Sequence, residues 1–489
     1  MVNQIILRIA AVVVTAITLV AALNLSATLE QFVRRFPDPI GLSGLGVVVV
    51  VGALSVASVW LLISLASRPR GRPWVPWIGV TLALAARLGV ALMIDAPLRA
   101  DAVIQNQLAI DVAEGACCFG HRPMGFPMLL GTAYGIFGVH QWVVEALNVL
   151  LGTLTALLVW ALARQVWGAA AGALAIGLFA VVPSQVLLVA VPLSELTYAL
   201  LLLAAIWAVA QWPRALIPAV AAVGVILALS HYVRPTSMAL LPFLAAVPLV
   251  AGATLRRGAL AAAVMVVVFV IALLPVVAFN LQAHDSPSIS TSAYGGWSLF
   301  VGANQEFNGT WNPDDAAIVA ELPGGSMWER SERAGDLAIE RITADPRGYA
   351  ELIVRKFNVM WADERYAVNY AVRHLGGRML ETVGLAAHLA YVSVLSLAAV
   401  AVWKGRQRQS SIMLAISLII VAVAVMHLFV EVHGRYHAYV VPLLCVLAGA
   451  AAGIPAVARR LPPGANDAPM GDDAEKRLAD TRTGAGSRF

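Results

Sequence analysis

Long apolar runs are the feature that most constrains the fold of this chain. Runs of about 20 residues with few charges recur along its whole length, and a helix of that length crosses the hydrocarbon core of a bilayer. The mean hydropathy is +0.80, with 60% hydrophobic and 12% charged residues. A soluble domain, with roughly 45–50% apolar residues, could not bury that surface. The sequence therefore predicts an all-α polytopic membrane protein.

The runs predict about twelve transmembrane helices. A further piece, 123–139, is short and contains Pro127, so we expect a re-entrant or interfacial helix there. The predicted spans are 5–23, 41–66, 75–94, 143–163, 169–190, 194–211, 214–232, 236–252, 259–281, 380–403, 411–430 and 436–456.

Basic residues concentrate in short loops that this threading puts on one side, for example "SRPRGRPW" at 67–74 and "KGRQRQ" at 404–409. The positive-inside rule makes that side the cytoplasm, and both termini are then cytoplasmic. Arg34 and Arg35 are an exception to the rule. Because the net charge of +5 lies largely in these loops, it indicates topology rather than binding to nucleic acid.

The spans divide the chain into five parts, and three segments face outward: 95–142, a short turn at 191–195, and 282–379. In the longest of these we expect two helices, 326–343 and 347–361, after a turn-rich extended stretch. The predicted parts are two extra N-terminal spans at 1–74, a transmembrane core at 75–281 with the outer loop 95–142, an outer soluble α+β segment at 282–379, C-terminal spans at 380–460, and a disordered cytoplasmic tail at 461–489.

Two aspartates follow the third span, in "LRADAVIQNQLAIDVAEG". As a helix, 101–115 puts Ile104, Leu108 and Val112 on one stripe flanked by Asp101 and Asp111, so we expect an amphipathic helix along the outer membrane face. Asp101 could simply cap this helix. A cap does not explain a second acid on the same side, however, and we interpret both acids as catalytic candidates.

That second acid is Glu195, which begins an otherwise apolar span in "VPLSELTYALLLL". An acid at the edge of the hydrocarbon is a functional candidate because its burial is costly, although an acid also suits a helix N-terminus. Three arginines are expected at the same outer level: Arg122, Arg234 and Arg435. Guanidinium groups suit bidentate binding of phosphate, so the sequence predicts a cavity for a lipid-borne phosphate, with snorkelling or ion pairing as the alternative.

The string "HLFVEVHGRYH" places His427 four residues from Glu431, and His433 four residues from His437. No strict metal-binding motif is present and Gly434 interrupts the helix, so we assign no metal ligands and expect interfacial belt residues, while a divalent cation cofactor stays open. We place His433, Tyr436 and Asp111 with the three arginines among the substrate-binding candidates.

These motifs together resemble those of the GT-C membrane glycosyltransferases. The resemblance is to the branch that holds the dolichyl-phosphate-mannose protein mannosyltransferases and the lipid A aminoarabinose transferases (glycosyltransferase family 39). It extends from about Ile78 to Ala452 and rests on seven strings in order: "LRADAVIQNQLA", "HRPMGFPMLLGTAYGIFG", "LNVLLGTLTALLVWALAR", "SEL", "RPTSMALLP", "GGWSLFVGAN" and "RYHAYVVPLL".

The resemblance implies a GT-C fold and an inverting sugar transfer from a polyprenyl-phosphate donor to an envelope glycan, lipid or protein, on the outer face of the cell membrane. It implies that Asp101 is the general base and that Glu195 positions a substrate; the arginines would stabilise the leaving phosphate. Ala102 follows Asp101 where the protein mannosyltransferases have a glutamate, which puts a protein acceptor in doubt.

Three other interpretations stay open. An O-antigen ligase or polymerase also uses a large outer loop and arginines, but would not be expected to show this ordered series. A transporter or lipid flippase predicts internal repeats, and the sequence shows none. A non-catalytic scaffold is disfavoured by the presence of both Asp101 and Glu195.

Overall fold

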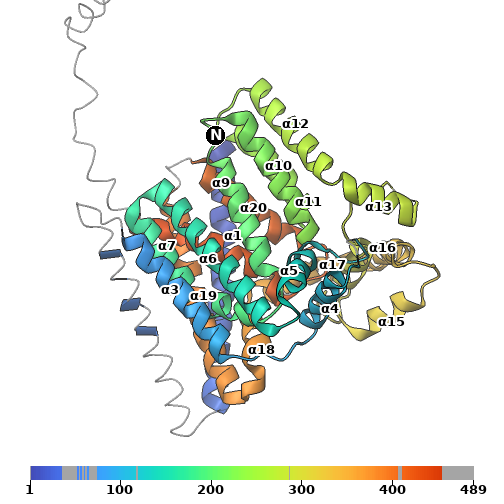
Figure 1. The fold of residues 1–489 in the computed structure, drawn as a ribbon, viewed down its shortest axis with the longest axis horizontal. Helices are drawn as coiled ribbons and strands as arrows, with labels where there is room; N and C mark the ends of the chain where they lie inside the picture. Colours follow the sequence, from blue (N-terminus) through green and yellow to red (C-terminus); the bar gives the residue numbers. More distant parts are fainter. Residues whose placement is uncertain are drawn as a thin grey trace, which may run out of the picture.

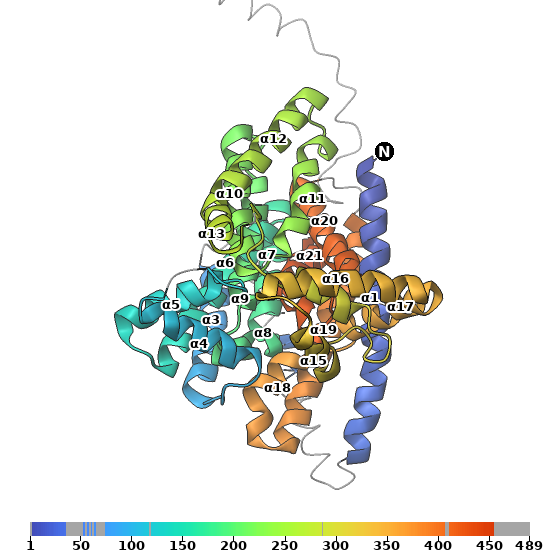
Figure 2. The same cartoon turned by 90° about the vertical axis from the view of Figure 1, so that its right-hand side faces the viewer.

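The structure is a computed structural model that describes residues 2–35, 74–116, 119–285, 287–405 and 410–453, with a few positions between 52 and 64. In this part of the chain all regular structure is helical, as Figures 1 and 2 show. The all-α polytopic membrane fold is therefore confirmed. Most of the predicted span 41–66 and the whole predicted tail 461–489 lie outside the described residues.

Seven described helices are long and apolar enough to cross a membrane. An eighth span would be a pair of helices bent by 62° at Val182, where Pro183 begins the second helix. The number twelve stays a prediction. The seven are α1 (Val2–Arg35), α3 (Val75–Met93), α6 (Gln141–Trp167), α10 (Leu216–Val233), α12 (Leu255–Ala272), α19 (Gly377–Gly405), and the 3₁₀ helix η3 (Gly434–Val440) continued by α21 (Val441–Gly453); the bent pair is α7 (Ala169–Val181) and α8 (Pro183–Leu187) with η1 (Leu188–Ala190).

Four apolar helices are shorter than a usual span. Three of them fall where spans are predicted, and one of these begins at the predicted site residue Glu195. The fourth, preceded by Pro123, falls on the predicted re-entrant piece. They are α9 (Glu195–Val209), α11 (Ser237–Val250), α20 (Ser411–Met426) and α5 (Gly125–Phe137).

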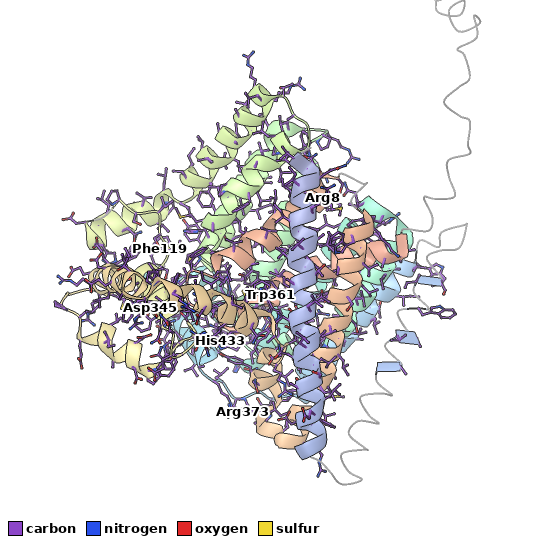
Figure 3. All side chains as sticks on the ribbon, turned by 180° about the vertical axis from the view of Figure 1, so that it is seen from behind. Arg8, Phe119, Asp345, Trp361, Arg373 and His433 are labelled. Atoms are coloured by element: carbon purple, nitrogen blue, oxygen red, sulfur yellow. The ribbon has the colours of Figure 1, made fainter. Side chains whose placement is uncertain are left out.

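Long-range packing joins the two ends of the sequence. Helix α1 packs along α19 and α20 and runs through most of the height of the molecule (Figures 2 and 3). Helix α21 packs against α19, α7 and α6. The central helix α21 is almost wholly buried, because its residues are small or apolar on every face, as expected for a helix surrounded by others.

The predicted amphipathic helix is α4 (Asp101–Ala113), but its buried face is not the predicted stripe. Ala102 and Ala109 are its fully buried residues, and α4 packs on α5, where Tyr134 donates a 2.6 Å hydrogen bond to Asn106. Small side chains allow this close approach. At Gly131 of α5, a Cβ atom would lie 2.6 Å from the carbonyl oxygen of Ala109.

The outer segment 282–379 has no strand in its described residues, so the α+β expectation is wrong there. Its turn-rich stretch is instead held by side chains: Asn280 donates to the carbonyls of Ser288 and Ser290, and Thr291 donates to that of His231. The two predicted helices are confirmed as α16 and α17. The segment contains the end of α13 (Leu274–His284), α14 (Gly295–Gly302), α15 (Pro313–Glu321), α16 (Met327–Ala344), α17 (Pro346–Trp361), α18 (Tyr366–Val372), η2 (Arg373–Leu375) and the start of α19.

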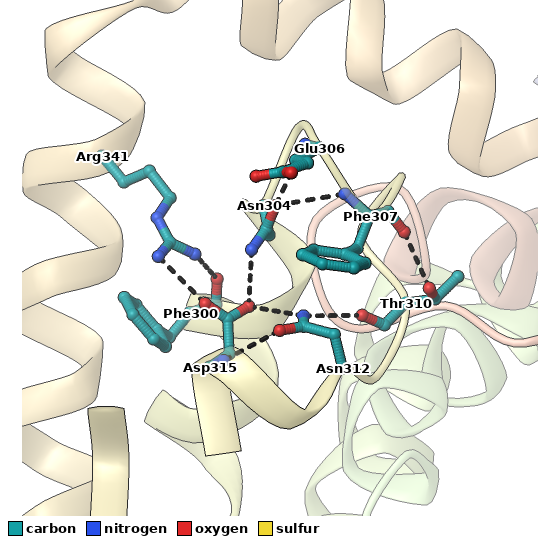
Figure 4. A network of polar contacts seen from close by, with 8 residues as sticks. All are labelled: Phe300, Asn304, Glu306, Phe307, Thr310, Asn312, Asp315 and Arg341. Carbon is teal, nitrogen blue, oxygen red and sulfur yellow. Dashed lines mark hydrogen bonds and ion pairs between the residues drawn. The ribbon is translucent and has the colours of Figure 1, made fainter. Parts of the chain in front are cut away.

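Asp315 fixes the loop that joins α14 to α15 (Figure 4). Its buried carboxylate accepts hydrogen bonds from the amides of Asn304 and Asn312 at 2.9 and 2.8 Å, and pairs with Arg341 of α16 at 3.0 Å. Arg341 also donates to the carbonyl of Phe300 at 3.0 Å. One carboxylate thus joins two helices and both ends of the loop.

Candidate functional site

A cavity of about 1430 Å³ lies where the apolar helices meet the outer segment. Its wall is formed by the start of α4, the loop before α5, the start of α9, the junction of α10 and α11, the helices α14–α16, and the chain from 426 to 436. Of the eight predicted site residues, seven line it: Asp101, Arg122, Glu195, Arg234, His433, Arg435 and Tyr436.

Asp111 is the predicted residue that does not line this cavity. It lies in the last turns of α4 and accepts a 2.9 Å hydrogen bond from Gln107 on the exposed side of the helix. Asp111 follows Asp101 by ten residues on the same helix and lies on a different face, so it is separated from the cavity. Asp111 is therefore a useful reference residue on the same helix.

Asp101 is the first residue of α4 and makes an ion pair with Arg435. The residue before it, Ala100, has φ of 45°, a conformation that costs a non-glycine residue about 1–3 kcal/mol. Burial raises the pKa of Asp101, but Arg435, with smaller contributions from Arg122 and Arg234, more than compensates and holds the pKa below its usual value. The side chain keeps 34% of its exposure, so an ionised carboxylate faces the cavity.

The short helix η3 holds Arg435 in place. The His433 ring accepts a 3.2 Å hydrogen bond from the main-chain N–H of Arg435. Two residues on, His437 bridges Glu364 and the carbonyl of Met360, and Ser184 donates to the same Glu364 at 2.7 Å. His437 and Glu364 are fully buried, so His437 is not the interfacial belt residue that the sequence suggested. Its acidic partner is distant in the sequence, so the local sequence pattern could not indicate the pair.

Glu195 is paired as well. It begins α9 and is 1% exposed, and its Oε1 accepts a 2.6 Å hydrogen bond from Nη2 of Arg234 at the end of α10. Nε of Arg234 donates to the hydroxyl of Ser194 at 3.1 Å. The two charges therefore neutralise each other on the wall of the cavity.

Arg122 and Arg330 differ from Arg234 and Arg435 in their partners. In the described part of the chain, no carboxylate lies within ion-pair distance of either guanidinium group. Arg122 lies over the ring of Tyr294, 4.9 Å from its centre, and Arg330 donates to the carbonyl of Gly324 at 3.3 Å. Both arginines line the cavity. The cavity therefore has more cationic side chains than the two, Arg234 and Arg435, that pair with carboxylates.

Two of the predicted binding residues lie together. His433 and Tyr436 have ring centres 6.0 Å apart, and both face the cavity. His433 is open to the cavity yet enclosed by protein, and this enclosure, with Arg435 nearby, lowers its pKa to about 4. His433 is therefore neutral at pH 7 and serves as the hydrogen-bond acceptor described above.

The sequence did not single out several cavity residues for a role here. Among them are Arg330, Tyr370 and Trp311 from the outer segment, which no motif marks, and Glu431, which the string "HLFVEVHGRYH" contains. His427, four residues before Glu431, is buried rather than at an interface. No group of three His, Cys, Asp or Glu that could hold a metal ion occurs among the described residues.

Comparison with known proteins gives one family match. The model of the dolichyl-phosphate-mannose-protein mannosyltransferases matches residues 121–281, about a third of the chain. This segment contains the predicted strings from "HRPMGFP" to "RPTSMALLP". Comparison with curated proteins gave no match.

Solved structures of membrane glycosyltransferases are similar at low identity. The archaeal oligosaccharyltransferase AglB from Archaeoglobus fulgidus is 15% identical over 86% of this chain with a TM-score of 0.47, and this chain covers 53% of it, about half its length. ArnT from Cupriavidus metallidurans is 17% identical over 80% of this chain, which covers 81% of it, with a TM-score of 0.36. The family match shows that residues 121–281 have the sequence pattern of the dolichyl-phosphate-mannose-protein mannosyltransferases, and it confirms the GT-C glycosyltransferase resemblance predicted from the motifs.

Proposed function

We propose that this chain is an integral-membrane glycosyltransferase that moves a sugar from a polyprenyl-phosphate donor to a glycan, lipid or protein acceptor on the outer face of the cell membrane. The observation that carries the proposal is the shared cavity, where the carboxylate of Asp101 and the guanidinium groups of Arg122 and Arg435 meet at the ends of apolar helices. A lipid-linked phosphate needs this combination of a cationic pocket beside hydrocarbon.

Asp101 is the general base of the proposed reaction. A base must be ionised and must reach the hydroxyl proton at about 2.6–3.2 Å. Asp101 is held ionised by Arg435 and is partly exposed to the cavity, whereas Glu195 is enclosed. As Asp101 takes the proton, the acceptor oxygen attacks the anomeric carbon from the face opposite the phosphate, so the configuration inverts.

Of the three predicted arginines, Arg122 is the best-placed ligand for the donor phosphate, because no carboxylate of the described chain pairs with it. Fixed cations that face the developing charge of a leaving group lower the barrier without reorganisation. Arg435 contributes from the side of Asp101. The Glu195–Arg234 pair is a positioning element in this scheme, since it joins the start of α9 to the end of α10.

The test is sugar transfer in membranes from a panel of radiolabelled polyprenyl-phosphate sugars, with Asp101→Asn compared with Asp111→Asn. Asp111 provides the matched control, since it lies on the same helix outside the cavity. We expect Asp101→Asn to lower the rate by roughly a hundredfold or more, as for loss of a general base, and Asp111→Asn to keep it.

Two outcomes would contradict the proposal. Equal transfer by the wild type and by folded Asp101→Asn would remove Asp101 from the base role. Absence of transfer from every donor would reject the donor class, and an undecaprenyl-diphosphate-linked glycan would then test the ligase alternative.

A further inference from the structure

Glu431 is a second carboxyl group in the same cavity that the proposed reaction has not used. It lies between α20 and η3, in a stretch fastened to the outer segment by main-chain hydrogen bonds. The Glu431 N–H donates to the carbonyl of Ser298 at 2.6 Å, and the Val432 N–H donates to that of Gly309 at 2.9 Å. Its side chain lines the cavity wall, so its carboxyl group is held at a fixed place near the other reactive groups.

Charged and titratable groups from five elements surround Glu431. They are Arg435 and Tyr436 of η3, Asp101 of α4, Arg122 before α5 and Lys356 of α17, and His427 at the end of α20 lines the same cavity. Burial is the largest influence and raises the pKa of Glu431 to about 7, although Arg435 opposes this effect. Asp101, in contrast, has a lowered pKa.

Resting on the proposed function, we infer that Glu431 is the general acid of the transfer: it protonates the phosphate oxygen that leaves the sugar while Asp101 accepts the proton of the acceptor hydroxyl. The new bond joins the acceptor oxygen to the anomeric carbon. The bond from that carbon to the phosphate oxygen breaks, and its electron pair stays on that oxygen, which takes the proton of Glu431. The proton on Asp101 then returns to Glu431 through solvent, so no co-reactant is consumed.

The chemistry of the leaving group matches this assignment. A phosphate monoester has a second pKa of about 6, so the phosphate released from the sugar gains an ionisable oxygen near neutrality. A general acid is most effective when its pKa lies near the working pH. Two carboxyl groups in one site, one kept ionised and one with its pKa raised to near neutrality, are the arrangement that divides base and acid roles.

The experiment is the pH dependence of kcat/KM for sugar transfer by purified full-length protein, with Glu431→Gln, Glu431→Asp and the control Glu332→Gln. Glu332 is an exposed glutamate of α16 outside the cavity. In the wild type we expect the rate to fall as the pH rises through about 7, because Glu431 loses its proton there. Glu431→Gln should lower the rate by roughly a hundredfold and remove this alkaline limb.

The outcomes distinguish failure of the acid role of Glu431 from failure of the proposed glycosyltransferase function. A wild-type rate in Glu431→Gln, or a reduced rate that keeps the alkaline limb, overturns the acid role and assigns the limb to another group such as Lys356. Absence of transfer by the wild type defeats the proposed function itself. Glu431→Asp keeps a titratable carboxyl group and should keep a shifted limb, so it provides the test if Glu431→Gln does not fold.

Discussion

Removing one partner of the Glu195–Arg234 pair should destabilise the protein more than removing both. The two charges are 2.6 Å apart, and their side chains are 1% and 14% exposed. Loss of one partner of a buried pair costs about 3–5 kcal/mol, because an uncompensated charge stays buried, whereas joint replacement by neutral groups is often close to neutral.

The structure predicts an asymmetry between the two single variants. Glu195→Gln leaves Arg234 with its 3.1 Å hydrogen bond to Ser194 and partial exposure to the cavity, so we expect a cost near the lower limit, about 3 kcal/mol. Arg234→Met leaves the enclosed Glu195 carboxylate without a cation, and one of its oxygens already has no hydrogen-bond partner, so we expect about 5 kcal/mol. The double variant should cost less than either.

The measurement is thermal unfolding in detergent micelles for the wild type, both single variants and the double variant. Because a polytopic protein can unfold irreversibly, the order of the midpoints is compared at one scan rate. Glu351→Gln is the control, since the exposed Arg347–Glu351 pair on α17 should contribute less than about 1 kcal/mol. A double variant as unstable as the sum of the single changes would refute the coupling, and a Glu195→Gln midpoint below that of Arg234→Met would refute the asymmetry.

Three further changes test other parts of the structure. Burial lowers the pKa of Lys356 to about 7 from 10.5, so between these pH values the unfolded chain binds the extra proton and the free energy of unfolding should rise with pH; melting temperatures should show this rise in the wild type and lose it in Lys356→Met. Asp315→Ala should free the loop that follows α14 and leave Arg341 unpaired, at a cost of about 2–3 kcal/mol, and limited proteolysis should then cut between 303 and 312 faster than in the wild type. Gly131→Val should push α4 from α5 and lower sugar transfer, since even a Cβ atom at this position would meet α4; unchanged transfer would refute that packing argument.

The helices were predictable where one physical requirement dominates. Hydrocarbon demands continuous apolar runs, and these mark most spans to within a few residues. Capping signals also act locally: Ser326 and Asp345 accept main-chain N–H groups at the starts of α16 and α17, the two outer helices that the sequence predicted. The sequence could not show that the described residues of the outer segment contain no strand. Turn-forming residues there form hydrogen bonds to main-chain groups of distant elements instead.

The site was predictable in its members but not in its pairings. Polar residues at the ends of apolar runs stand out against the hydrocarbon, which is why Asp101, Glu195 and the arginines could be selected. Which acid meets which arginine depends on packing between distant residues: Asp101 and Arg435 are 334 positions apart. Arg330 enters the cavity because the outer segment 282–379 forms part of its wall, and no local sequence pattern indicates that.

In the proposed reaction the phosphate changes its charge, and the balance of charge in the cavity suits such a ligand. Within the described residues its wall has four arginines, of which Asp101 and Glu195 neutralise two. Arg122 and Arg330 are left to face a phosphodiester, which has one negative charge before transfer, and a monoester, which has about −1.5 to −2 after it. The surplus cations therefore favour the leaving group over the donor, as transition-state stabilisation requires, but they would also retain the product. In the proposed mechanism a proton from Glu431 returns the product to a single charge, so the group that assists departure of the phosphate would also weaken the binding of the product to the site.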